Sequence, residues 1–172
     1  GDNYAGDNET DSTKRHFAPV SWAPDSRKFA TFKWDMSMVK PFWVINSITD
    51  PRPTLETYHY QMPGEPGPKP FLYVIDTEGN ARSVKVVAFK DQECSVLDSP
   101  RTTKDSYNDF RGSRWLGDND HFWLVRQSRD LKRLDLCRVD VGADSTHTVI
   151  SERMNTYVEY RSPRLLPDGR LV

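Results

Sequence analysis

The sequence has little of what marks membrane, nucleic-acid-binding or disulfide-stapled proteins. No apolar run approaches the roughly 18 residues needed to cross a bilayer, and the N-terminal stretch lacks the basic and apolar regions of a signal peptide. The 24 Lys and Arg nearly balance the 25 Asp and Glu, so we expect neither a nucleic-acid partner nor a membrane span. The only two cysteines are Cys94 and Cys137, and two free thiols are favoured over one disulfide.

Catalytic motifs are also missing. A serine hydrolase of the α/β class places its nucleophile on a G-x-S-x-G elbow, whereas Gly112 and Ser113 are followed here by Arg-Trp-Leu. The four histidines are widely separated and form no zinc-binding pattern, and no glycine-rich phosphate loop is present. We therefore expect no catalytic residue, no metal site and no cofactor in this chain.

What the sequence does contain is a succession of short β-forming segments separated by turns. Residues 20–22 and 29–34 flank a Pro-Asp-Ser turn, and residues 71–76 and 81–87 flank Glu-Gly-Asn, whose residues tolerate positive φ. Each pair of segments predicts an antiparallel hairpin. Residues 115–151 predict a meander of four strands, which is the size of one propeller blade.

One sequence unit recurs along the chain. WAPDSRKF, WLGDNDHF and LLPDGRLV each join an apolar residue, a tight turn and a strand, and the last two units start about fifty residues apart, as propeller repeats do. The pattern predicts an all-β fold, a partial β-propeller of about two four-stranded antiparallel blades plus the start of a third. The alternative is a β-sandwich, which predicts no such repeat.

The repeat also predicts how the chain is organised, with residues 1–172 forming a fragment of one propeller domain. The first blade covers about 18–98 and contains a long insertion at 36–70, the second covers about 107–152, and the next begins within 157–172. The insertion is rich in Pro and Gly and has little periodicity. Long excursions of this kind are usually functional.

The order of these motifs resembles a known family. SWAPDSRKFATFKWD is followed by a long loop that ends in TYHYQMPGEPGPKPFLYVID, and the similarity continues through residues 115–126 and DLCRVD. In these motifs the chain resembles the N-terminal propeller of dipeptidyl peptidase IV-like serine peptidases, which belong to the prolyl oligopeptidase clan. The matching positions are Trp22, Tyr60, Gly64, Pro68 and residues 72–76.

The resemblance implies a role within a larger enzyme. Propellers of this family cap an α/β-hydrolase domain and limit access to unfolded or short peptides. The chain would then be a non-catalytic segment that gates and binds peptide substrates for a hydrolase domain absent from its 172 residues. The implied partners are peptides, that hydrolase domain and a second copy in a homodimer. The implied compartment is periplasmic or secreted, with the cytoplasm as the alternative.

Four residues are candidates for substrate binding by this resemblance. The family holds the substrate's α-ammonium with two adjacent glutamates, and Glu9 and Asp11 are the only acids near that place here; the alternative is a solvated acidic loop. Tyr160 and Arg161 stand where the family has an aromatic residue and an arginine in its extended substrate pocket. The alternative is that Tyr160 packs between blades and Arg161 pairs with an acid.

The aromatic residues of the insertion and the overall function each have two interpretations. Trp43, Tyr58 and Tyr60, which lie among the prolines of the insertion, either line the substrate tunnel or contact a second subunit. The rival function is a propeller that binds proteins or glycans with no peptidase attached. A G-x-S-x-G elbow further along the same gene would decide for the peptidase.

Overall fold

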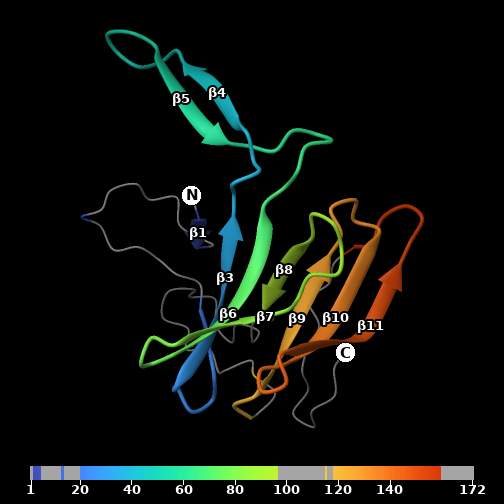
Figure 1. Cartoon of the computed structure of the whole chain (residues 1–172). Helices are drawn as coiled ribbons and strands as arrows, with labels where there is room; N and C mark the ends of the chain where they lie inside the picture. The colour runs from blue at the N-terminus through green and yellow to red at the C-terminus, as the bar shows by residue number, and fades with distance from the viewer. Residues whose placement is uncertain (1, 5–12, 14–19, 97–114, 116–117, 160–172) are drawn as a thin grey trace, which may run out of the picture.

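The computed structural model describes residues 2–4, 13, 20–96, 115 and 118–159. All regular secondary structure in this part of the chain is β-strand, and all strand pairs are antiparallel (Figure 1). The strands form two main sheets and a separate two-stranded arm. Within the described ranges there is no helix with the length and apolarity to pass through a membrane.

The first sheet joins four strands in the order β1-β3-β6-β7, and β2 also pairs with β3. Its strands are β1 (Asp2–Tyr4), β2 (Ser21–Trp22), β3 (Lys28–Asp35), β6 (Lys69–Asp76) and β7 (Ala81–Val84). The β2–β3 turn is closed by the Ala23 amide, which donates to the Lys28 carbonyl at 2.9 Å. The β6–β7 turn places Gly79 at φ 89°, a conformation that a Cβ would strain.

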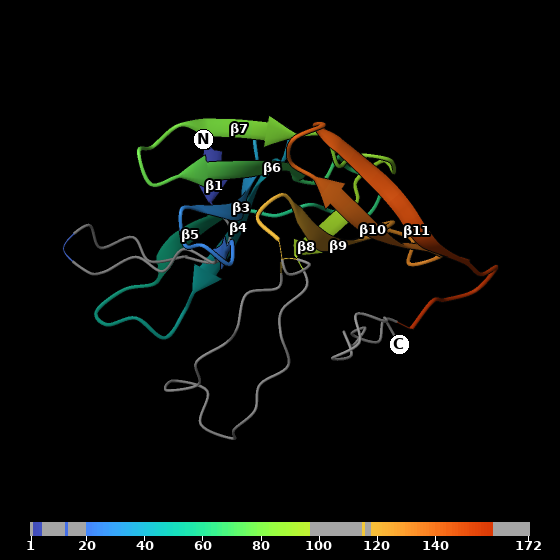
Figure 2. The same ribbon diagram turned by 90° about the horizontal axis from the view of Figure 1, so that it is seen from below.

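The second sheet is a meander in the order β11-β10-β9-β8 (Figure 2). Its strands are β8 (Glu93–Val96), β9 (His121–Gln127), β10 (Arg133–Asp140) and β11 (Ser145–Arg153). The β9–β10 and β10–β11 turns use Leu131 at φ 59° and Asp144 at φ 51°. β9 and β11 run in the same direction as β3, so the β9–β10 turn lies at the end of the molecule toward which β3 points (Figure 1).

The two-stranded arm projects away from both main sheets (Figure 1). It consists of β4 (Pro41–Asn46) and β5 (Thr54–His59), which pair only with each other among the described strands. Its base is closed by the Tyr60 amide, which donates to the Lys40 carbonyl at 3.1 Å. Large apolar side chains stay exposed along it, with Trp43 64%, Ile45 70% and Leu55 66% accessible.

One hydrophobic core joins the two main sheets. Phe32 and Leu72 from the first sheet and Phe122 and Leu124 from the second belong to the same buried cluster. Trp115 belongs to it as well, with its ring centroid 5.0 Å from that of Phe122. The Trp115 indole N–H donates to the carbonyl of Ser21 at 3.2 Å, which links the second sheet's core to the first sheet. Burial of these large side chains supplies the main stabilisation of the pair of sheets.

The predicted all-β fold with antiparallel blade-sized sheets is confirmed, and so are the predicted hairpins. Cys94 and Cys137 are buried free thiols, as favoured. Two features differ from expectation. The insertion forms the β4–β5 hairpin, and β8, which falls inside the range 18–98, pairs with β9 of the second sheet, where Cys94 enters the shared core. The blade boundaries themselves stay predictions.

Candidate functional site

The four predicted substrate-binding residues, Glu9, Asp11, Tyr160 and Arg161, lie outside the described residues. The structure describes the chain as far as residue 159, and residues 154–158 lie alongside the β9–β10 turn. The Met154 amide donates to the Lys132 carbonyl at 3.0 Å, and the Val158 amide donates to the Leu131 carbonyl at 2.8 Å. Val158 precedes Tyr160 by two positions in the sequence, so the described chain is anchored to this turn just before the predicted pair.

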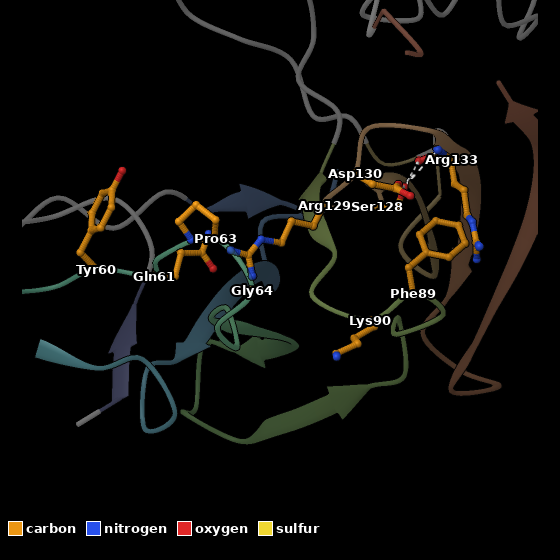
Figure 3. Close-up of a pocket in the computed structure, with 10 residues that line it drawn as sticks. All are labelled: Tyr60, Gln61, Pro63, Gly64, Phe89, Lys90, Ser128, Arg129, Asp130 and Arg133. Carbon is orange, nitrogen blue, oxygen red and sulfur yellow. Dashed lines mark hydrogen bonds between the residues drawn. The ribbon is translucent and has the colours of Figure 1, made fainter. Parts of the chain in front are cut away.

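A groove of about 660 Å³ opens at the same turn (Figure 3). Three loops that are distant in the sequence line it: the segment after the arm, the segment after β7 and the β9–β10 turn. The lining residues are Tyr60, Gln61, Pro63, Gly64, Phe89, Lys90, Ser128, Arg129, Asp130 and Arg133. The groove therefore bridges the first and second sheets.

Arg129 fastens the loop after the arm to the β9–β10 turn. Its guanidinium donates to the carbonyls of Met62, at 3.1 Å, and Glu65, and it lies 3.7 Å from the Asp91 carboxylate. The Glu65 carboxylate is held in turn by the Lys40 ammonium at 2.9 Å, and this hydrogen bond, followed by one from the Met62 amide, lowers the pKa of Glu65. These contacts hold the loop after the arm, which forms one wall of the groove, against the β9–β10 turn, which forms another.

The β9–β10 turn is shaped by its own side chains. The Asp130 carboxylate accepts from the Ser128 hydroxyl at 2.5 Å and from the Lys132 amide at 3.1 Å. These hydrogen bonds, that of Ser128 first, hold the pKa of Asp130 below its usual value, so the group is ionised at neutral pH. The turn thus carries a negative charge on Asp130, whose carboxylate is hydrogen-bonded by donors of the same turn.

A buried charge cluster lies behind Phe89. The Arg126 guanidinium pairs with Asp135 at 2.9 Å, and the Arg153 guanidinium pairs with the same carboxylate at 2.7 Å. Both guanidinium carbons lie over the Phe89 ring, at 5.5 Å and 5.2 Å from its centroid. The Ser151 hydroxyl donates to Asp135 at 3.1 Å. Since its donors are satisfied within the protein, this cluster positions Phe89 and does not itself offer a ligand site.

The groove lining is mainly cationic. It carries the cations Lys90, Arg129 and Arg133 against the single anion Asp130. A nucleophilic serine needs a base that is oriented by a third group. In the part of the chain that the structure describes, one serine contacts a histidine, Ser145 with Oγ 3.0 Å from His147 Nε2, and it lies on β11 outside the groove lining.

The sequence does not identify the groove residues as a site, although Tyr60 and Gly64 are among the positions that carry the family resemblance. Lys90 lies in the loop after β7, and Arg133 is the first residue of β10; no motif marks either as a site residue. They meet only because β7, β9 and β10 bring residues about forty positions apart to one end of the sheets. No local pattern of residue types records such a meeting.

Blade-sized antiparallel sheets that share a core, with a groove where their loops meet, define the class of this protein as a β-propeller segment. The family model for the dipeptidyl peptidase IV N-terminal region matches residues 15–169. The chain therefore belongs to the dipeptidyl peptidase IV N-terminal region family.

Solved structures agree with this fold. The chain is similar to the crystal structure of dipeptidyl peptidase 4 from Porphyromonas gingivalis, with a TM-score of 0.63 at 15% identity over 81% of this chain. It is also similar to a protein from Bacteroides ovatus described as a dipeptidyl aminopeptidase IV, with a TM-score of 0.62 at 18% identity over 84% of this chain. The chain spans only 18% of the length of each of these proteins. No curated protein matches the chain.

Proposed function

We propose that the chain is a non-catalytic segment of the propeller of a dipeptidyl peptidase IV-like serine peptidase. It gates and binds peptides for an α/β-hydrolase domain carried elsewhere on the same polypeptide. The family match over residues 15–169 is the observation that carries the proposal. The blades proposed are about 18–98 with the insertion 36–70, about 107–152, and the start of another within 157–172.

Substrate binding in this proposal depends on Tyr160 and Arg161, with Glu9 and Asp11 as the acids that meet the substrate's α-ammonium. The β9–β10 turn, to which Val158 is hydrogen-bonded, supports the first pair by anchoring the chain just before it. A guanidinium can hold a peptide carbonyl while an aromatic ring packs an apolar side chain.

The proposal is tested by peptidase kinetics. This chain alone should leave a Gly-Pro chromogenic substrate uncleaved, while the polypeptide encoded by the complete gene should cleave it and lose activity with a serine-directed inhibitor. In that polypeptide Arg161→Ala should raise KM more than it lowers kcat, because it removes binding made in the ground state and the transition state alike. Arg161→Lys should recover part of the loss, and the control Arg138→Ala, at an exposed position of β10, should change neither constant. Cleavage by this chain, or an unchanged KM for Arg161→Ala, would contradict the proposal.

A homodimer formed through the β4–β5 arm is part of the proposal. Trp43, Ile45 and Leu55 are exposed on an arm whose described strands pair with neither main sheet, and they are suited to burial against a second copy. The variant Trp43→Ser with Ile45→Ser should convert a dimer to a monomer by light scattering at equal concentration. A periplasmic or secreted location is proposed for the parent, and cell fractionation tests it.

The second candidate is a propeller that binds proteins or glycans without a peptidase. The cationic groove is the observation that favours a binding role of its own. A gene that continues without a G-x-S-x-G elbow would decide for this candidate.

A further inference from the structure

Two cations of the groove are free to meet a ligand. The Lys90 ammonium and the Arg133 guanidinium are exposed, and within the described ranges neither makes a hydrogen bond or an ion pair. Arg129, the third cation, is occupied by the carbonyls of Met62 and Glu65. The groove therefore presents two positive charges that no described side chain holds in a hydrogen bond or salt bridge.

The acid of the groove forms no salt bridge with these cations within the described ranges, although, besides the hydrogen bond from Ser128, the nearby Arg133 charge helps to lower the pKa of Asp130. Asp130 directs its carboxylate to the Ser128 hydroxyl and the Lys132 amide, inside its own turn. In the part of the chain described by the structure it forms no ion pair with Lys90 or Arg133. An incoming carboxylate would thus meet the cations without first having to displace Asp130.

Aromatic side chains stand next to the cations and are held in place. Phe89 lies beneath the guanidinium groups of Arg126 and Arg153, and Tyr60 packs on Phe42 with their centroids 5.7 Å apart. Figure 3 shows Phe89 beside Arg133 at one end of the groove and Tyr60 at the other. Because both rings are restrained by these contacts, they offer apolar surface at a low further entropic cost.

We infer that this groove binds an acidic segment of a peptide, with Lys90 and Arg133 pairing with its carboxylates and Phe89 and Tyr60 packing on neighbouring apolar side chains. The inference rests on the proposed function and specifies the kind of peptide the propeller receives. A peptide is favoured over nucleic acid because only two free cations line the groove and the chain's net charge is −1.

The test measures binding to the chain by fluorescence anisotropy. The probe is a labelled peptide with two glutamates between phenylalanines. The control peptide has glutamines in place of the two glutamates and is otherwise identical. The glutamate peptide should bind more tightly than the glutamine peptide, and 0.5 M NaCl should weaken binding of the glutamate peptide more than binding of the glutamine peptide. Lys90→Gln and Arg133→Gln should each weaken it about two- to fivefold, as expected for exposed ion pairs, and the double variant roughly tenfold. The control Arg52→Gln, in the turn of the arm outside the groove lining, should bind like the unmodified chain.

The outcomes separate this inference from the proposed function. If both peptides bind equally and the double variant binds them as the unmodified chain does, the inference is wrong while peptide binding stands. If neither peptide binds a chain whose circular dichroism shows β-structure, both fail. An oligonucleotide of equal charge that bound more tightly through Lys90 and Arg133 would assign the groove to nucleic acid and overturn the inference.

Discussion

At the scale of single residues, Asp135 is the most constrained charge of the second sheet. It is 2% exposed and pairs with Arg126, which is 8% exposed, and with Arg153. Removing one partner of a buried pair leaves the other charge uncompensated, which costs about 3–5 kcal/mol. Asp135→Asn should therefore lower the free energy of unfolding by roughly 3 kcal/mol in urea denaturation. Asp25→Asn, at an exposed turn position, is the control, and equal losses for the two variants would contradict the account.

The same carboxylate predicts a pH dependence. Burial alone would raise the pKa of Asp135, but the hydrogen bonds from Arg153, Arg126 and Ser151 outweigh it and lower the pKa below its usual value of 3.8. A group with a depressed folded-state pKa stabilises the fold fully above its unfolded pKa and loses that contribution as the pH falls through the folded value. Unfolding measured between pH 5 and 2 should show stability falling below about pH 4, with a shallower fall in Asp135→Asn.

The thiols give a prediction about reactivity. Burial raises the pKa of Cys94 to about 12, with hydrogen bonding from Gln92 opposing it, and burial also raises the pKa of Cys137. The thiolate is the reactive form, and little of it exists at pH 8 in the folded chain. Ellman's reagent should label neither cysteine at pH 8 within minutes and should label both in 6 M guanidinium chloride. Rapid labelling of the native chain would contradict this.

At the scale of elements, the arm is separable from the rest of the fold. β4 and β5 pair only with each other among the described strands, and the hydrogen bond between Tyr60 and Lys40 brings the ends of the arm together. Replacing residues 41–59 by a Gly-Asn-Gly linker should change the free energy of unfolding by less than about 1 kcal/mol, because it removes exposed surface and no core contact. Chemical denaturation measures this, and a loss of several kcal/mol would show that the arm supports the sheets.

Most strands of the two main sheets were predictable from their β-forming residues and tight turns, whereas β4, β5 and β8 were not. β3 and β6 are rich in β-forming residues beside tight turns, and β6 alternates between buried and less buried residues, which is the pattern that identifies a half-buried strand. β4 has five of its six residues exposed, so neither face is marked as buried and its apolar run lacks alternation. β8 is four residues long, and its partner β9 begins 27 positions after Cys94. Only the tertiary pairing reveals this strand.

The candidate site divides in the same way. Family resemblance supplied Tyr160 and Arg161, and these residues remain predictions. The groove beside the β9–β10 turn depends on Phe89 and Lys90 from the loop after β7 and on Arg133 at the start of β10, which meet through sheet topology. Sequence patterns report local geometry, and this groove is made by long-range geometry.

At the scale of the whole molecule, the two sheets should unfold as one unit. Phe122 is completely buried in the cluster that both sheets share, and Trp115 and Leu72 belong to that cluster. Phe122→Ala should cost about 3–5 kcal/mol. Hydrogen exchange should then accelerate in β3 and β6 as well as in β9 and β10. Ile48→Ala, at a side chain that is 91% exposed, is the control. Faster exchange confined to the second sheet would show that the sheets are independent.

The placement of the arm between β3 and β6 also bears on how the chain reaches its fold. Residues 36–68 separate these paired strands, and bringing the ends of so long a segment together costs chain entropy. A hairpin forms within microseconds from local contacts. Once β4 and β5 have paired, Lys40 and Tyr60 are already adjacent, and the remaining search is that of a much shorter loop. The hairpin inside the insertion therefore offsets part of the chain entropy that the insertion adds to the cost of pairing β3 with β6.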